Sequence, residues 1–122
     1  LDFGGNRPKS VDEMEALYEA LLDRLHDRLP DAKVAVLAIF PSPLNAGRSE
    51  QIEAVNERVR RAAEAKPWLT LIDGNAALKT PTGEPDRSLF LFDRVHLNKA
   101  GYAKWAQILR PQLLELWRQQ LH

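Results

Sequence analysis

Apolar positions recur along this chain with the period of a helix in three separate segments. In residues 11–29, 49–65 and 98–117, apolar side chains return every three or four residues, and polar residues fill the positions between them. This spacing places the apolar side chains on one face of a helix and leaves the other face to water. We therefore expect three amphipathic helices over these ranges.

Residues at the helix ends strengthen two of these predictions and complicate the third. Ser10 followed by Glu13 has the spacing of a capping box, and Asn98 is suited to cap the last helix. Pro111 stands inside the last helix. An interior proline removes a backbone donor and costs about 3 kcal/mol. Pro111 should therefore kink the helix or make it restart.

Short apolar, β-rich runs stand between the helical segments. They are "LDF" at residues 1–3, "KVAVLAIF" at 33–40 and "WLTLID" at 68–73. The second run is too continuous to leave one face in water, which is typical of a strand covered on both sides. The alternation of strands and helices predicts an α/β fold with a parallel sheet, helices on both faces and right-handed crossovers.

The polar segments that follow these strands are where chemistry is expected. Ligands of open parallel sheets bind beyond the carboxyl ends of the strands. The segments in that position are "GGNRP" after the first strand and "PSPLNAGR" after the second, and a long loop over residues 74–91 leads to Asp93 and His96. Long loops inside compact domains are usually functional or mobile. We expect these segments to meet at one rim of the sheet.

Composition excludes several classes of partner. The chain has 122 residues, enough for one domain, and 17 basic residues balance 17 acidic ones, so a nucleic acid partner is not expected. No apolar run approaches the ~20 residues that span a membrane. Cysteine is absent, which leaves no thiol chemistry and leaves the compartment open. The spacing of His, Asp and Glu resembles no metal site, and we expect neither a metal nor a cofactor.

The stretch "FDRVHLNKAGYAKW" places Asp93 and His96 three residues apart among apolar neighbours. At this spacing a carboxylate can hold one nitrogen of an imidazole while the other faces a cleft, as acyl transfer through a serine requires. Asp-x-x-His alone is weak evidence, because an aspartate that caps a turn beside a packed histidine has the same pattern. His26 lies on a charged helix face and is interpreted as a solvated side chain.

The combination of "GGN", "PSP" and "FDRVHLNKAGYAKW" resembles the GDSL-type, or SGNH, hydrolase family from its third conserved block to its end. The resemblance implies a flavodoxin-like, three-layer α/β fold and a Ser-His-Asp ester hydrolase that needs no cofactor. It implies that His96 is the general base and Asp93 its orienting partner. It also implies that Asn6 donates to the oxyanion, with Gly4 in the same turn.

The chain departs from the family pattern at two places. Arg7 stands where the family has an aspartate after the asparagine. The Gly-Asp-Ser block that carries the nucleophile, and the block with a second oxyanion glycine, have no counterpart, and no serine of the chain stands in such a block: Ser10, Ser42, Ser49 and Ser88. We therefore interpret residues 1–122 as the C-terminal portion of a single domain whose first strands and nucleophile are missing from this chain.

This interpretation has consequences for partners. The expected substrate is a small ester, either an acyl ester or an acylated carbohydrate, and the chain alone should be inactive. The strand at residues 1–3 would expose an unpaired edge, and such edges recruit other strands. We expect association with the protein's own N-terminal segment or with another copy. The competing hypothesis is a non-catalytic fragment that binds a ligand or a partner chain.

Overall fold

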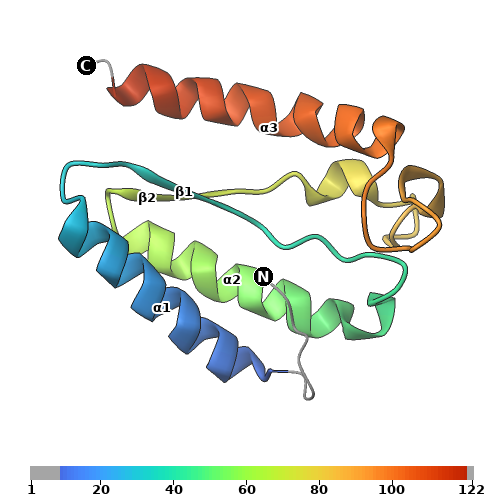
Figure 1. Ribbon diagram of the computed structural model, residues 1–122, viewed down its shortest axis with the longest axis horizontal. Helices are drawn as coiled ribbons and strands as arrows, with labels where there is room; N and C mark the ends of the chain where they lie inside the picture. The colour runs from blue at the N-terminus through green and yellow to red at the C-terminus, as the bar shows by residue number, and fades with distance from the viewer. Residues whose placement is uncertain (1–8, 121–122) are drawn as a thin grey trace. The chain divides into compact units, whose positions relative to one another are not determined.

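The computed structural model describes residues 9–120, so the strand expected at residues 1–3 lies outside the described part of the chain. The helices and strands follow one another in the order α1 (Val11–Arg28), β1 (Val34–Leu37), α2 (Ser49–Ala65), β2 (Leu69–Ile72) and α3 (Lys99–Gln120) (Figure 1). The chain divides into two compact units, which are described separately: unit 1 is Leu1–Val36 with Glu50–Leu71, and unit 2 is Leu37–Ser49 with Ile72–His122.

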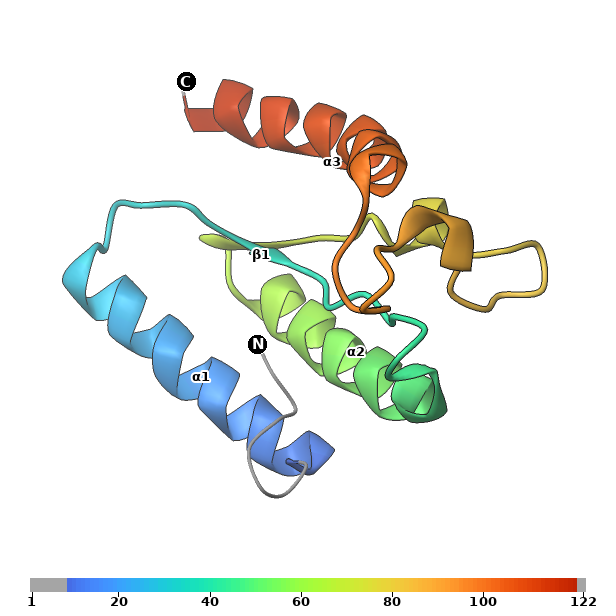
Figure 2. The same ribbon diagram turned by 45° about the vertical axis from the view of Figure 1, so that its right-hand side comes forward.

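Unit 1 holds two helices that lie side by side, α1 and α2 (Figure 2). The capping box of α1 is formed: the Ser10 hydroxyl accepts the Glu13 backbone N–H at 3.1 Å, and the Glu13 carboxylate accepts the Ser10 N–H at 3.3 Å. The predicted apolar face of α2 is buried, with Ile52 and Val55 each 0% exposed. The face of α1 is buried only in part: Met14 is 0% exposed, but Leu17 and Leu21, at the same helical spacing, are 47% and 49% exposed. Burial of these faces is the main source of stability for such helices.

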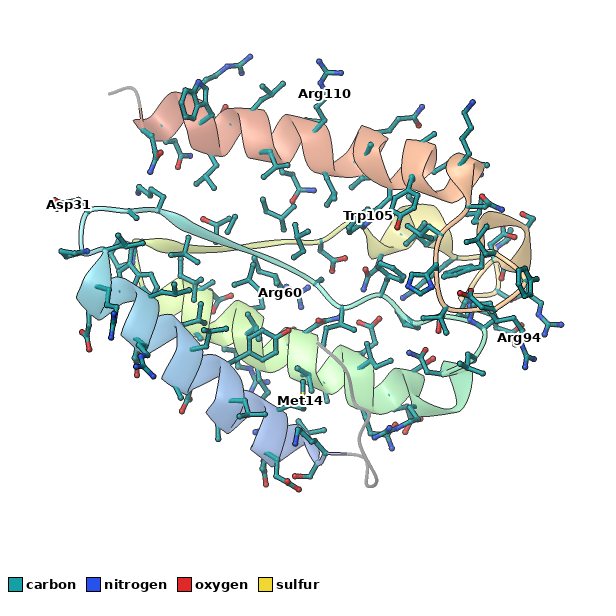
Figure 3. The ribbon with its side chains drawn as sticks, in the orientation of Figure 1. Met14, Asp31, Arg60, Arg94, Trp105 and Arg110 are labelled. Carbon is teal, nitrogen blue, oxygen red and sulfur yellow. The ribbon has the colours of Figure 1, made fainter. Side chains whose placement is uncertain are left out.

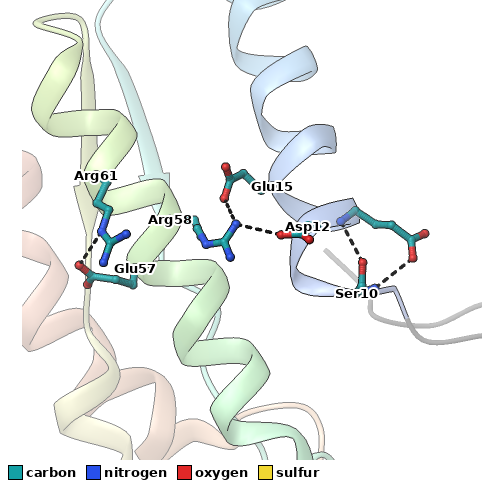
Figure 4. A network of polar contacts seen from close by, with 7 residues as sticks. Ser10, Asp12, Glu15, Glu57, Arg58 and Arg61 are labelled. Carbon is teal, nitrogen blue, oxygen red and sulfur yellow. Dashed lines mark hydrogen bonds and ion pairs between the residues drawn. The ribbon is translucent and has the colours of Figure 1, made fainter.

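Polar contacts join the two helices at the surface. Arg58 on α2 donates to Asp12 at 3.0 Å and to Glu15 at 2.6 Å, both on α1 (Figure 4). Because exposed ion pairs are screened by water, these contacts contribute little to stability. The ring of His26 stacks on Trp68 with centroids 4.2 Å apart, so the expectation that His26 is a solvated side chain is wrong.

The two described strands are parallel neighbours. Val34 N–H donates to Trp68 O at 2.7 Å and Ala38 N–H donates to Ile72 O at 2.9 Å, so both partners advance together along the chain. The α/β class with a parallel sheet is confirmed. Complete burial of the second apolar run is not: β1 alternates between half-buried and exposed positions, and Leu37 is 42% exposed. The continuous apolar run reflects β propensity more than burial on both faces.

Unit 2 is built around α3 and the segment before it. Two short 3₁₀ turns, Asn75–Leu78 and Arg87–Leu89, interrupt the expected long loop and contact α3. Its core contains four buried side chains and two aromatic residues packed against them: Leu78, Leu89, Phe90 and Leu97, with Phe40 and Trp105. Trp105 leaves α3 on the side of the first 3₁₀ turn (Figure 3).

Pro111 does not make α3 restart, because a single helix runs from Lys99 to Gln120. The side chain of Gln112, the next residue, donates to Ile108 O at 3.0 Å and to Asp73 O at 3.3 Å. One bond joins Gln112 to the preceding turn of α3, and the other joins it to the segment after β2. Within residues 9–120, no helix is long and apolar enough to cross a membrane.

Candidate active site

The Asp93–His96 turn is a tight hairpin between residues 90 and 97. Its base is an antiparallel bridge between Phe90 and Leu97. Inside the bridge, Leu91 N–H donates to His96 O at 2.8 Å, and Arg94 N–H donates to Leu91 O at 2.9 Å. Arg94 has φ 63°, the left-handed conformation, which L side chains rarely adopt. The sequence pattern did not predict a left-handed residue at this position.

Asp93 and His96 are in contact, as their spacing predicts. His96 Nδ1 lies 2.7 Å from Asp93 Oδ2. The other carboxylate oxygen, Asp93 Oδ1, accepts the backbone N–H of Val95 at 2.9 Å and that of His96 at 3.1 Å. The hydrogen bond from the His96 ring, followed by the two backbone bonds, lowers the pKa of Asp93 to about 2.

The contact with an ionised carboxylate determines which ring nitrogen carries the proton. At neutral pH the Asp93 carboxylate is ionised and can only accept hydrogen bonds. His96 Nδ1 must therefore be the donor in the 2.7 Å contact. In a neutral imidazole this leaves the lone pair on Nε2. An imidazole in this tautomer is ready to accept a proton from a hydroxyl placed beside Nε2.

The pair is more exposed than its apolar neighbours suggested. The side chain of His96 is 68% exposed and that of Asp93 is 39% exposed. Phe92, the residue before Asp93, is itself 99% exposed. Packing within the described chain therefore does little to fix the position of the His96 ring, which depends mainly on its hydrogen bond to Asp93.

The second predicted rim segment does meet this turn. Leu44, in the "PSPLNAGR" loop after β1, donates its N–H to Arg94 O at 3.1 Å. Within that loop, Asn45 Oδ1 accepts the Ser42 N–H at 2.7 Å and closes a small turn. The prediction that these two loops converge is confirmed. Arg94 itself is labelled in Figure 3. Asn6 and Gly4 lie outside the described residues.

The end of the "FDRVHLNKAG" motif explains how the turn is anchored. Leu97 is buried at 2% exposure, directly after the exposed His96. Gly101, in the first turn of α3, lies so close to the preceding segment that a Cβ there would stand 2.2 Å from Leu89 O. Only glycine permits this approach of helix to backbone. Sequence reasoning used this pattern for recognition and missed its mechanical role.

Three of the four serines have hydroxyl groups in local hydrogen bonds, and the buried Ser42 hydroxyl has no partner among the described residues. Ser10 caps α1, the Ser49 hydroxyl donates to Ala46 O at 2.8 Å, and the Ser88 hydroxyl bonds Asp86 Oδ1 at 2.7 Å. Ser42 is 2% exposed. In the part of the chain that the structure describes, no group of three or more His, Cys, Asp or Glu side chains is arranged to hold a metal ion.

The sequence model of the GDSL-like Lipase/Acylhydrolase family matches residues 2–104, which is most of the chain and includes the Asp93–His96 turn. The chain belongs to this family. The curated relatives include the platelet-activating factor acetylhydrolase IB subunit alpha1 of Pongo abelii, 27% identical, and that of Homo sapiens, 26% identical. Each alignment covers 93% of this chain and 49% of the relative, so the chain spans about half the length of these relatives.

Two solved structures with a similar fold are of proteins named as esterases. An acetyl esterase variant solved with an acetate ion is 23% identical and has a TM-score of 0.72. A carbohydrate esterase family 3 protein from Talaromyces cellulolyticus is also 23% identical, with a TM-score of 0.71. Both likenesses cover 91% of this chain and 52% of the other chain. At this identity they establish the fold, and the fold is that of the SGNH-type esterases.

Proposed function

We propose that this chain supplies the base half of a serine ester hydrolase. His96 accepts the proton of a serine hydroxyl and later returns it to the leaving alcohol, and Asp93 keeps the His96 ring in the required tautomer. Asn6 donates to the oxyanion, with Gly4 in the same turn. The serine nucleophile comes from a segment other than residues 1–122, which form the C-terminal portion of a single domain.

The observation that carries this proposal is the 2.7 Å contact between His96 Nδ1 and an ionised Asp93. It meets two requirements of a triad, namely a base and a group that orients it. A third feature is the exposure of the His96 side chain at 68%, which leaves room for a nucleophile from another segment. Membership of an acylhydrolase family supports the same chemistry and does not favour a non-catalytic role.

The proposed substrate is a small acyl ester, and an acetyl ester is the first choice for a test. The curated relatives are named acetylhydrolases, and the solved neighbours are an acetyl esterase and a carbohydrate esterase. The proposed partner is the protein's own serine-bearing N-terminal segment, or another copy of the chain. Exposed apolar side chains on α3, such as Leu113 at 44% and Trp117 at 59%, are consistent with such a partner.

The test is reconstitution with a Gly-Asp-Ser segment. The chain is coexpressed with the N-terminal half of a family relative, and hydrolysis of p-nitrophenyl acetate is measured together with copurification of the two pieces. His96→Ala should lower turnover by about 10³-fold or more, and Asn6→Ala by roughly 10²–10³-fold. The chain alone should show no serine-dependent turnover.

The matched control is His26→Ala, which removes a histidine stacked on Trp68 in unit 1 and given no catalytic role. It should leave turnover of the reconstituted protein within about twofold of the unsubstituted one. Equal turnover in the His96→Ala and unsubstituted proteins would refute the assignment of the base. A chain that behaves as a stable monomer and captures no N-terminal half would refute the proposed partner.

A further inference from the structure

Asn98, two residues after His96, makes more hydrogen bonds than a helix cap requires. Its side-chain oxygen accepts the Gly101 N–H at 2.9 Å, which is the capping bond of α3. Its side-chain Nδ2 donates to Ser88 O at 2.8 Å and makes a longer contact of 3.4 Å to Phe90 O. Its backbone N–H donates to Leu89 O at 2.9 Å. One side chain thus joins the start of α3 to residues 88–90, at the end of the second 3₁₀ turn.

The residues that Asn98 contacts, 88–90, directly precede Leu91, whose backbone binds that of His96. Leu91 N–H donates to His96 O, and the Phe90–Leu97 bridge closes the hairpin just outside it. Because the His96 ring is 68% exposed, packing does not fix its place. The ring position therefore depends on the backbone of residues 96–98 and on the bond to Asp93.

We infer that Asn98 is a positioning residue for the Asp93–His96 pair. Its side-chain amide ties the C-terminal arm of the hairpin to residues 88–90 and so holds His96 within reach of Asp93. The inference rests on the proposed function only for its catalytic meaning. The geometric statement stands or falls with the position of the imidazole, which can be measured in this chain without turnover.

A plain capping role is the competing explanation, and chemistry separates the two. Serine at an N-cap accepts a backbone N–H about as well as asparagine does. Serine has no amide to donate to Ser88 O or Phe90 O. Asn98→Ser therefore removes the cross-link made by the side-chain amide and leaves the backbone bond to Leu89 O in place. It keeps an N-cap acceptor and adds no charge beside Asp93. Asn98→Ala removes both.

The experiment is NMR of the chain with labelled histidine and aspartate. Two signals are followed: the downfield Nδ1–H proton of His96 and the titration of the Asp93 carboxyl. We expect Asn98→Ser and Asn98→Ala to weaken or abolish the Nδ1–H signal to a similar degree. In both variants the pKa of Asp93 should rise from about 2 toward its ordinary value, because the His96 bond is the largest cause of its low value.

A matched control separates positioning from general loss of stability. Ser10→Ala removes the N-cap of α1 in unit 1 and should lower the melting temperature while leaving both signals unchanged. If Asn98→Ser keeps both signals and only Asn98→Ala loses them, Asn98 is a cap and the inference is wrong. Unchanged signals in both variants would overturn it as well.

A measurement on the unsubstituted chain covers the case in which the variants do not fold. The Nδ2 protons of Asn98 should exchange slowly with solvent and show through-bond coupling to the Ser88 carbonyl. Fast exchange without coupling would show that the cross-link does not exist in solution. If the Asn98 variants shift the His96 signals and the reconstituted enzyme still ignores His96→Ala, the positioning stands and the proposed function falls.

Discussion

Two hairpin turns of unit 2 are closed in the same way but contain different residues at their left-handed position. The turn at residues 79–85 is closed by an antiparallel Lys79–Pro85 bridge, and Gly83 takes φ 89°. The turn at 90–97 is closed by the Phe90–Leu97 bridge, and Arg94 takes φ 63°. Glycine adopts this conformation without cost, whereas another residue loses about 1–2 kcal/mol there.

The difference shows that the second turn is held by its surroundings. Asp93 accepts two backbone N–H groups just beyond Arg94, and Leu44 donates to Arg94 O from another loop. The first turn has local bonds, such as the 2.7 Å bond from Thr80 N–H to Glu84 O. Unfavourable backbone conformations persist where the structure over-determines them, often at functional sites. The turn that carries the proposed base is of this kind.

The largest loss of stability is expected at Gly101, where α3 packs closely against Leu89, just before the turn at 90–97. Gly101→Ala places a Cβ against Leu89 O and should lower the free energy of unfolding by about 1–3 kcal/mol or more. Urea denaturation measures the loss, and backbone amide shifts should move in residues 90–97 and stay in place in 79–85. Gly47→Ala is the control, because its new Cβ meets nothing within 4 Å. Equal losses in the two variants would remove the close approach as the cause.

Exchanging the residue type at the left-handed positions sharpens the comparison. Gly83→Ala should lower the free energy of unfolding by about 1–2 kcal/mol. Arg94→Gly relieves a similar strain, but glycine gains about 0.5–1 kcal/mol of freedom in the unfolded chain. The net effect of Arg94→Gly should therefore be a gain between zero and about 1.5 kcal/mol in the free energy of unfolding. Thermal melts measure both changes, and a clear loss in Arg94→Gly would mean that Arg94 makes stabilising contacts of its own.

The smallest effect concerns acid, and only the second turn should show it. The folded-state pKa of Asp93, about 2, lies below the ordinary value. Its contribution to stability is therefore present above about pH 4, the unfolded value, and is lost as pH falls toward 2. NMR titration should show the hydrogen bonds of residues 93–96 loosening over that window, with turn 79–85 unchanged. His96→Ala should raise the pKa of Asp93 only part of the way, because the two backbone donors remain. A pKa that does not change in this variant would contradict the ring contact.

Interactions between residues close in the chain made much of this molecule predictable. The period of apolar positions placed α1, α2 and α3, and the Ser10–Glu13 box formed as its spacing predicts. The contact of Asp93 with His96 also followed from spacing, because three residues span a single turn. Patterns of this kind depend on backbone geometry that any surroundings share. The roles of Asn6 and Gly4 stay predictions.

Features that depend on distant segments could be known only from the folded chain. The left-handed φ of Arg94 occurs where Leu44, from a loop far away in the sequence, donates its N–H to Arg94 O. The need for glycine at position 101 arises from Leu89, which comes from the other arm of the hairpin. The exposure of His96, and the cross-link from Asn98 to Ser88, likewise required coordinates. Such contacts join residues that are separated in the sequence. Each of these residue types is compatible with several other arrangements, so the sequence alone does not predict which contacts form.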